Sequence, residues 1–399
     1  MQIKRIRLFA AALLAAFSVG AWAQTVKVGV VLPYSGVGAE FAQQIHRGMQ
    51  VFMQMNPEAF GPYKIEIVKR DSKSPSGADA KTAVQELIVQ DKVDILTGFV
   101  YSPDAIASAA LFTEAKKPAV IMNAGTAWIT NLSPMISRVS FSMWHAGHAM
   151  GEASAKNLKA KTAVIGYTDF PPGKDSLDAF KRAFQANGGK VIDEIPMGGA
   201  GQVPDFTPFF QRAKDKKPDV FFVFVPSGDH AVAVTKTYSA LGMKQAGIKL
   251  VGPGDLTPDH KLQSMGDSAV GLITIHHYNA DLNNPINKRF VKTWKDNYGE
   301  QSSPDFMGVQ AYDGMAAIAH AVVAMKGKMD PEGTINALKG WKYNSPRGPI
   351  SIDPATRDIV MNEYLSEVVK SGGRLVQKNL GVINNVKDMC KELKEGRCK

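Results

Sequence analysis

The stretch Gln24-Thr25-Val26-Lys27-Val28-Gly29-Val30-Val31-Leu32-Pro33-Tyr34-Ser35-Gly36 decides the fold class. Its residues are apolar from Val26 to Leu32 with little interruption, as in a strand that is buried on both faces of a parallel sheet. The Pro-Tyr-Ser-Gly segment that follows is typical of the turn by which such a strand leads into a helix. The pattern therefore predicts that the mature chain opens with a buried strand of an α/β sheet.

An export signal precedes this strand. Lys4, Arg5 and Arg7 are basic, residues 8–19 form an apolar stretch, and Ala21 and Ala23 are the small residues that a signal peptidase requires. The apolar run is shorter than the ~20 residues that span a bilayer, and no cysteine near the cleavage point could carry a lipid. We therefore expect residues 1–23 to be a signal peptide, cleaved after Ala23, and the mature chain to be periplasmic.

Downstream of the first strand, short apolar runs alternate with amphipathic stretches, which indicates βα units around parallel sheets. The expected strands are residues 26–32, 64–68, 93–98, 119–122, 162–167, 190–195, 220–225, 248–252 and 270–275, with short ones near 349–352 and 360–369. The expected helices are residues 41–55, 78–90, 103–115, 145–157, 174–187, 206–214, 230–241, 287–298, 307–325 and 331–338.

A weak internal repeat relates the two halves of this pattern. Residues 63–68 and 93–99 are strands that flank a helix, and residues 189–194 and 218–224 repeat the arrangement. Two similar α/β lobes explain the repeat more simply than one large sheet does.

Composition excludes several classes of function. The chain has 399 residues, 45% of them hydrophobic, and a formal net charge of +10. Its lysines are scattered and alternate with acidic residues, so we expect a solvated surface and no nucleic-acid partner. The two cysteines, Cys390 and Cys398, are expected to close a small loop in an oxidising compartment.

No catalytic or metal-binding motif stands out. His145 and His148 have the spacing of two metal ligands on a helix, but no third ligand is near them in the sequence. The chain contains no G-x-S-x-G elbow, no G-x-G-x-x-G fingerprint and no G-x-x-x-x-G-K-[ST] loop. We therefore predict that the protein is not an enzyme and uses neither a metal nor a cofactor.

Ligands of open α/β sheets bind beyond the carboxyl ends of the strands. Loops at residues 33–38, 98–104, 122–128 and 167–173 occupy such positions. Ser102 and Thr126 lie in two of these loops, where backbone N–H groups at a helix start and a hydroxyl donor could hold an anion. The alternative interpretation of Ser102 is that it only caps the following helix.

Five segments, in this order, resemble the leucine/isoleucine/valine-binding-protein family of periplasmic receptors for ABC importers: residues 28–36, 98–104, 123–126, 311–314 and 348–350. The resemblance covers nearly the whole mature chain. It implies a type I periplasmic binding fold, in which two Rossmann-like lobes with parallel sheets are joined by three hinge crossovers. Residues 24–140 plus 276–350 would form lobe I, residues 141–275 plus 351–385 lobe II, and residues 386–399 a C-terminal tail. The resemblance also implies a monomer that delivers a small carboxylate to a membrane ABC permease.

The resemblance also assigns roles in the site. Ser102, Ala124 and Thr126 would hold the ligand carboxylate, Phe41 would cover the ligand side chain, and Tyr101 would flank the pocket from lobe I. From lobe II, loops at residues 169–173, 226–229 and 254–255 would close over the ligand, and they contribute Phe170, Ser227 and Asp255.

Two ligand classes remain open at this point. A branched-chain amino acid needs a carboxylate for its buried ammonium, and only Asp255 stands near the family's position for it. The segments 170–174 and 252–257 resemble the branch of the family that binds aromatic carboxylates, and such a pocket could be lined by Trp128, Trp144, Phe170 and Phe306. Alternative functions are a ligand sensor on the same fold and, less favoured, a hydrolase or lyase.

Overall fold

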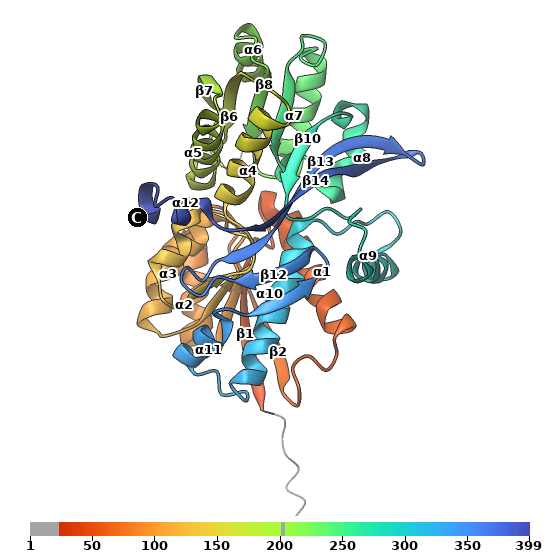
Figure 1. Ribbon diagram of the computed structural model, residues 1–399. Helices are drawn as coiled ribbons and strands as arrows, with labels where there is room; N and C mark the ends of the chain where they lie inside the picture. The colour runs from red at the N-terminus through yellow and green to blue at the C-terminus, as the bar shows by residue number, and fades with distance from the viewer. Residues whose placement is uncertain (1–23, 201–203) are drawn as a thin grey trace, which may run out of the picture.

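The computed structural model describes residues 24–200 and 204–399, and the predicted signal peptide lies outside these ranges. Two α/β lobes lie one above the other in Figure 1, with the strands β10, β12, β13 and β14 near their junction. The prediction of two lobes with parallel sheets is confirmed. The residue bounds proposed for the lobes stay a prediction.

The sheet of lobe I has the order β2-β1-β3-β4-β5, and every neighbouring pair in it is parallel. The first strand lies inside the sheet, between β2 and β3, and it is buried on both faces as its sequence predicts. Val28 and Val30 belong to one apolar cluster, whereas Val31 belongs to another on the opposite face. The strands of this sheet are β1 (Thr25–Leu32), β2 (Lys64–Asp71), β3 (Ile95–Gly98), β4 (Ala119–Ile121) and β5 (Ile136–Arg138).

The sheet of lobe II has a parallel part in the order β7-β6-β8-β9-β10. Antiparallel strands extend it: β13 pairs with β10, β12 and β14, and β11 pairs with β12. The strands are β6 (Thr162–Tyr167), β7 (Lys190–Pro196), β8 (Val220–Phe224), β9 (Lys249–Pro253), β10 (Ile273–His276), β11 (Lys342–Ser345), β12 (Gly348–Ile352), β13 (Ile359–Ser371) and β14 (Arg374–Val386).

Helices cover the faces of both sheets (Figure 1). Those of lobe I are α1 (Ala39–Met55), α2 (Ala78–Val89), α3 (Ser102–Glu114), α9 (Pro285–Tyr298), α10 (Phe306–Ala324) and α11 (Pro331–Leu338). Those of lobe II are α4 (Met143–Lys156), α5 (Pro171–Ala186), α6 (Thr207–Asp215), α7 (Asp229–Ala240) and α8 (Asp259–Met265). At the junction lie η2 (Ala127–Leu132), α12 (Met389–Glu392) and η5 (Gly396–Cys398). No helix in the described ranges is both long and apolar enough to cross a membrane.

Helices α1 and α10 approach each other closely in lobe I. A Cβ atom on Gly48 of α1 would lie 2.0 Å from the carbonyl oxygen of Gly308 in α10, so only glycine fits there. This contact fixes the position of α1, whose first turn carries Glu40 and Phe41 toward the junction between the lobes.

Most of the predicted elements agree with the structure, but the end of the chain does not. The expected short strand near residues 360–369 is the longer β13, and β14 was not predicted at all. Strand β14 brings the chain back from lobe II, since Val386 pairs with Met361 near the start of β13. The predicted disulfide between Cys390 and Cys398 is confirmed.

Candidate ligand-binding site

A cavity lies between the two lobes, which is a common place for a small-molecule site. Lobe I contributes mainly the loops that follow β3 and β4, and lobe II contributes those that follow β6, β8 and β9. The cavity is lined by Phe41, Val100, Tyr101, Ser102, Asn123, Gly125, Phe141, Met143, Phe170, Pro172, Phe224, Pro226, Ser227, Asp255 and Met307.

Ser102 lines the cavity from lobe I, and Thr126 lies directly beside it but is fully buried and does not itself line the cavity. The Oγ of Ser102 accepts a hydrogen bond from the backbone N–H of Thr126 at 3.0 Å, so the hydroxyl proton of Ser102 is left to donate to another acceptor. The Oγ1 of Thr126 is buried and has no hydrogen-bond partner among the described residues. The Ser102 hydroxyl is therefore available as a donor at the cavity wall, and the Thr126 hydroxyl is an unpaired donor buried behind that wall.

Two expectations about this side of the cavity need correction. Ser102 does not cap helix α3, because Tyr101 is the N-cap residue and its side chain makes no capping bond. Ala124 is fully buried behind the cavity wall, and its backbone N–H donates to the carbonyl of Phe99 at 2.9 Å. The neighbours of Ala124, Asn123 and Gly125, line the cavity in its place.

Aromatic rings form the walls of the cavity. On the side of lobe I, the ring of Phe41 packs edge-on against Tyr101, with their centroids 6.3 Å apart. On the side of lobe II, Phe170 and Phe224 lie nearly parallel, with an interplanar angle of 15°. Phe141 completes the lining near the hinge. Flat apolar walls of this kind favour a flat apolar ligand.

Asp255 lies at the cavity from lobe II, and its side chain is buried. Its Oδ2 has no hydrogen-bond partner in the described part of the chain, and the Nε2 of His276 is 3.7 Å away. Burial raises the pKa of Asp255 to about 7. A desolvated carboxyl group with one oxygen left without a partner is poised to accept a hydrogen bond from a ligand.

A row of buried polar side chains lies behind Asp255. The Nδ1 atoms of His276 and His277 are 2.6 Å apart, and the Nε2 of His277 lies 3.0 Å from the amide nitrogen of Gln310. Burial, together with the charge of Arg347, lowers the pKa of His276 to about 3. The ring beside Asp255 is therefore neutral and does not pair with its charge.

The lobes are also joined at the cavity rim by a cross-lobe ion-pair cluster of Glu40, His260, Lys261 and Asp305. The Nζ of Lys261 is 2.7 Å from Glu40 Oε2, and the Nδ1 of His260 is 2.8 Å from Asp305 Oδ2. Burial disfavours a charged His260, but the carboxylates of Asp305 and Glu40 prevail and raise its pKa to about 9. The cluster holds α8 of lobe II against α1 and α10 of lobe I.

We expect the substitution Lys261→Met to weaken ligand binding about fivefold, because a partly exposed ion pair that forms on closure contributes about 1 kcal/mol at most. Isothermal titration calorimetry measures the change. Lys292→Met is the matched control, since Lys292 pairs with Asp296 within the same helix, α9. An equal loss in both variants would mean that the cluster does not hold the closed form.

The pH dependence of this cluster has a defined sign. Because the pKa of His260 is raised, its attraction to Asp305 is complete below its ordinary pKa and is lost as the pH rises through about 9. The pKa of Glu40 is lowered, so its contribution is lost only in acid, below its ordinary pKa. The affinity contributed by the cluster should therefore be complete below about pH 6.5 and decline progressively from there to about pH 9.

Several aromatic residues that were expected at the ligand lie elsewhere. Trp128 and Trp144 line a separate cavity beside the disulfide, and Phe306 packs against His276 at 4.5 Å. Phe170 is at the ligand cavity as predicted, and Phe141 and Phe224 were missed.

His145 is fully buried and bonded to Ser142 and Ile359. Among the described residues, no group of three or more His, Cys, Asp or Glu side chains is arranged to hold a metal.

Two α/β lobes with a small cavity between them, lined by a hydroxyl group from lobe I and a carboxyl group from lobe II, define a solute-binding protein that closes around its ligand. Residues 25–374 match the family model described as periplasmic binding protein, and the chain belongs to this family. It is thus a periplasmic solute-binding protein of the type that serves ABC importers.

Relatives of known identity agree with this assignment. The chain is 37% identical to the Leu/Ile/Val-binding protein homolog 6 of Brucella melitensis, over 92% of this chain and 94% of that protein. A solute-binding protein of Rhodopseudomonas palustris BisB5, solved with 3,4-dihydroxybenzoic acid, is 40% identical, with a TM-score of 0.87 over 92% of this chain and 99% of that one. A second R. palustris protein, solved with 4-hydroxybenzoate, is 38% identical, with a TM-score of 0.87 over 91% and 98%.

Proposed function

We propose that this protein captures a hydroxylated aromatic carboxylate, of which 4-hydroxybenzoate is the simplest example, and delivers it to an ABC permease. The observation that carries the proposal is the set of groups around the cavity. Lobe I contributes the hydroxyl of Ser102 with the buried Thr126 beside it, both lobes contribute aromatic rings, and lobe II contributes Asp255, whose Oδ2 has no hydrogen-bond partner among the described residues.

Each part of such a ligand would meet a suitable group. The carboxylate would accept hydrogen bonds from Ser102 and Thr126. The ring would lie between Phe41 and Phe170, which line the cavity from opposite lobes. The ring hydroxyl would donate to Asp255. The ligands named for the two R. palustris proteins have this chemistry.

A branched-chain amino acid is the second candidate, because Asp255 could also pair with a buried ammonium. The aromatic lining favours the first candidate. The amino acid would need a strongly ionised partner, whereas burial favours the neutral form of Asp255.

The test is a thermal-shift and calorimetry panel on ligand-stripped protein, with 4-hydroxybenzoate, 3,4-dihydroxybenzoate, benzoate, leucine, isoleucine and valine. A ligand that binds only the folded state adds about 4 kcal/mol at a thousandfold excess over its Kd. We expect the largest shift with the hydroxylated acids and none with the amino acids. A shift with the amino acids alone would assign Asp255 to an ammonium and overturn the proposal.

We also propose that the partner is an ABC permease and that the signal peptide is cleaved after Ala23. Uptake of labelled 4-hydroxybenzoate by cells should fall when the gene is deleted, and unchanged uptake with a lost transcriptional response would indicate a sensor. N-terminal sequencing of the exported protein should begin at Gln24, as cleavage after Ala23 predicts.

A further inference from the structure

Arg138 of β5 holds the loop of residues 123–127, which carries Thr126. Arg138 is fully buried, and its Nη1 donates to the carbonyl of Thr126 at 2.6 Å and to that of Ala124 at 3.2 Å. Its Nη2 donates to the carbonyl of Ala127 at 3.2 Å. One guanidinium therefore fixes three carbonyls on both sides of Gly125. The position of Thr126 beside Ser102 depends on these contacts.

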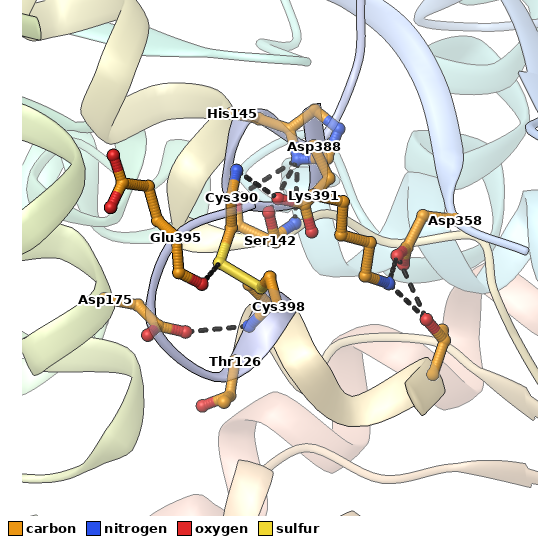
Figure 2. Close-up of a disulfide and its surroundings, with 12 residues drawn as sticks. Thr126, Ser142, His145, Asp175, Asp358, Asp388, Cys390, Lys391, Glu395 and Cys398 are labelled. Atoms are coloured by element: carbon orange, nitrogen blue, oxygen red, sulfur yellow. Dashed lines mark hydrogen bonds and ion pairs between the residues drawn. A yellow bond between two sulfur atoms is a disulfide. The ribbon is translucent and has the colours of Figure 1, made fainter. Parts of the chain in front are cut away.

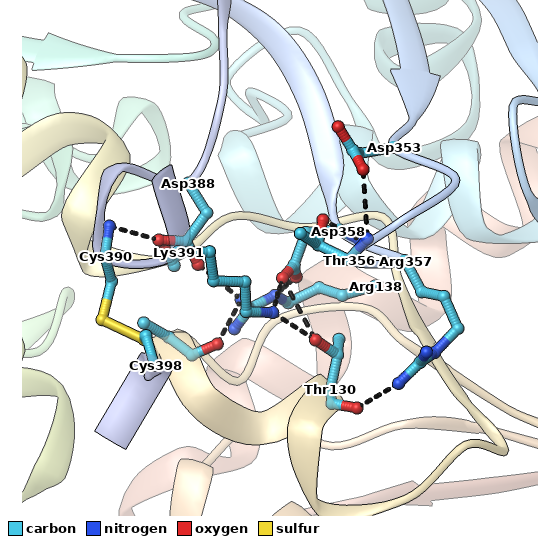
Figure 3. Close-up of polar contacts among 12 residues, drawn as sticks. Thr130, Arg138, Asp353, Thr356, Arg357, Asp358, Asp388, Cys390, Lys391 and Cys398 are labelled. Carbon is cyan, nitrogen blue, oxygen red and sulfur yellow. Dashed lines mark hydrogen bonds and ion pairs between the residues drawn. A yellow bond between two sulfur atoms is a disulfide. The ribbon is translucent and has the colours of Figure 1, made fainter. Parts of the chain in front are cut away.

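The charge of Arg138 is balanced by residues from the last part of the chain (Figure 3). Its Nε donates to Asp358 at 2.6 Å, and its Nη2 lies 3.3 Å from Asp388. Asp358 also pairs with Lys391, so it does not serve Arg138 alone. A buried guanidinium needs such partners, because an unpaired charge is costly away from water.

The disulfide holds Asp388 in place (Figure 2). We refer to residues 388–399 as the disulfide loop. Asp388 accepts a hydrogen bond from the backbone N–H of Cys390 at 3.0 Å, and Cys390 is bonded to Cys398. The two cysteines pack in one small apolar cluster with Ala127 of lobe I and with Trp144 and Ala179 of lobe II. The disulfide loop is therefore anchored against both lobes.

Lobe II holds the same segment from the other side. The Oδ2 of Asp175 in α5 accepts a hydrogen bond from the backbone N–H of Ala127 at 2.7 Å. The disulfide loop bonds α5 as well, since Arg182 lies 3.0 Å from Glu395. Loop 123–127, α5 and the disulfide loop thus form one connected unit when the lobes are together.

We propose that Arg138 is a positioning residue for the ligand carboxylate, and that the disulfide loop maintains its position through Asp388. The inference rests on the proposed carboxylate site at Ser102 and Thr126. Arg138 does not line the cavity, so it acts through the backbone of loop 123–127. The loss of Arg138 or of its partner frees the loop and selectively weakens recognition of the ligand's carboxylate end.

The test compares 4-hydroxybenzoate with its uncharged amide, 4-hydroxybenzamide, by calorimetry. The variants are Arg138→Lys, Asp388→Asn and the double variant Cys390→Ser with Cys398→Ser. We expect Arg138→Lys to reduce the preference for acid over amide about tenfold, as for the loss of one or two charge-assisted bonds. The other two variants should reduce this preference about threefold to fivefold, because they act on loop 123–127 only indirectly, through Arg138.

Arg347→Lys is the matched control. Arg347 is also a buried arginine with a carboxylate partner, Asp313 at 2.7 Å, and it donates to the carbonyl of Ser140, outside loop 123–127. This control should be destabilised in thermal unfolding and yet keep the acid preference. If Arg138→Lys fails to fold, Asp388→Asn and the cysteine pair decide the question.

The outcomes separate the two proposals. An equal loss of acid and amide binding in the Arg138 and Asp388 variants would show a purely structural role and overturn the inference. If the proposed function is wrong, the unmodified protein itself will show no preference for the acid over the amide.

Discussion

Replacement of Ser102 and Thr126 together by alanine should reduce the affinity for 4-hydroxybenzoate by more than about 100-fold. Each hydrogen bond to a charged group contributes ~1.5–3 kcal/mol, and the double variant removes two of them from a buried site. Isothermal titration calorimetry on folded protein measures the loss. Each single variant should lose about half of the binding free energy that the double variant loses.

The control for this result is Ser108→Ala. Ser108 is buried in the same helix, α3, but its hydroxyl donates to the carbonyl of Asp104 at 2.8 Å and does not line the cavity. We expect less than a threefold change with this control. Unchanged affinity in the double variant would remove the carboxylate site from this side of the cavity.

Replacement of Asp255 by alanine should reduce the affinity for 4-hydroxybenzoate about 30-fold and raise that for benzoate. The unmodified site has a buried acceptor that only the hydroxylated ligand can satisfy, so it should reject benzoate. Calorimetry with the two ligands above about pH 8 gives the comparison. Loss of leucine binding in this variant, with benzoates unaffected, would contradict the assignment.

The same residue predicts a pH dependence. The pKa of Asp255 is raised to about 7 by burial, and only its ionised form is a full acceptor for the ligand hydroxyl. The preference for 4-hydroxybenzoate over benzoate should therefore grow between about pH 6 and about pH 8, and this dependence should vanish in Asp255→Ala. Asp259→Asn is the control, because Asp259 is a buried carboxyl group that does not line the cavity.

The fold was largely predictable because its strands and helices are local in the sequence. Apolar runs such as residues 26–32 and 220–225 correspond to β1 and β8. Both strands are buried on both faces, and a nearly continuous apolar sequence is what such a strand requires. Helix α11 begins and ends at the residues that the pattern predicts.

Strand β14 escaped prediction for a physical reason. Most of its residues from 378 to 385 are exposed, so it lacks the apolar alternation that marks a half-buried strand. The available signal was the pair Gly372-Gly373, both with positive φ, which suits the tight turn of a hairpin. The long β13–β14 hairpin follows from that turn.

The site was predictable only where its residues follow strands. Ser102, Thr126, Phe170 and Asp255 lie in loops at the carboxyl ends of strands, where the topology of an α/β sheet places ligands. The support of Arg138 by Asp358 and Asp388 joins residues 220 and 250 positions apart, and no local pattern marks it. Phe141 and Phe224 were missed because a buried aromatic at the end of a strand has the same sequence signal as a core residue.

The position of the disulfide loop gives the molecule an intrinsic optical reporter. Arg397 of this loop lies over the indole ring of Trp128 at 4.7 Å, and Trp144 packs in the same cluster as the two cysteines. The two tryptophans belong to different lobes, and both sense the charge and the sulfur atoms of the loop. Their fluorescence should therefore follow the docking of the loop during ligand binding, without any attached dye, and Trp128→Phe and Trp144→Phe would assign the signal to each lobe.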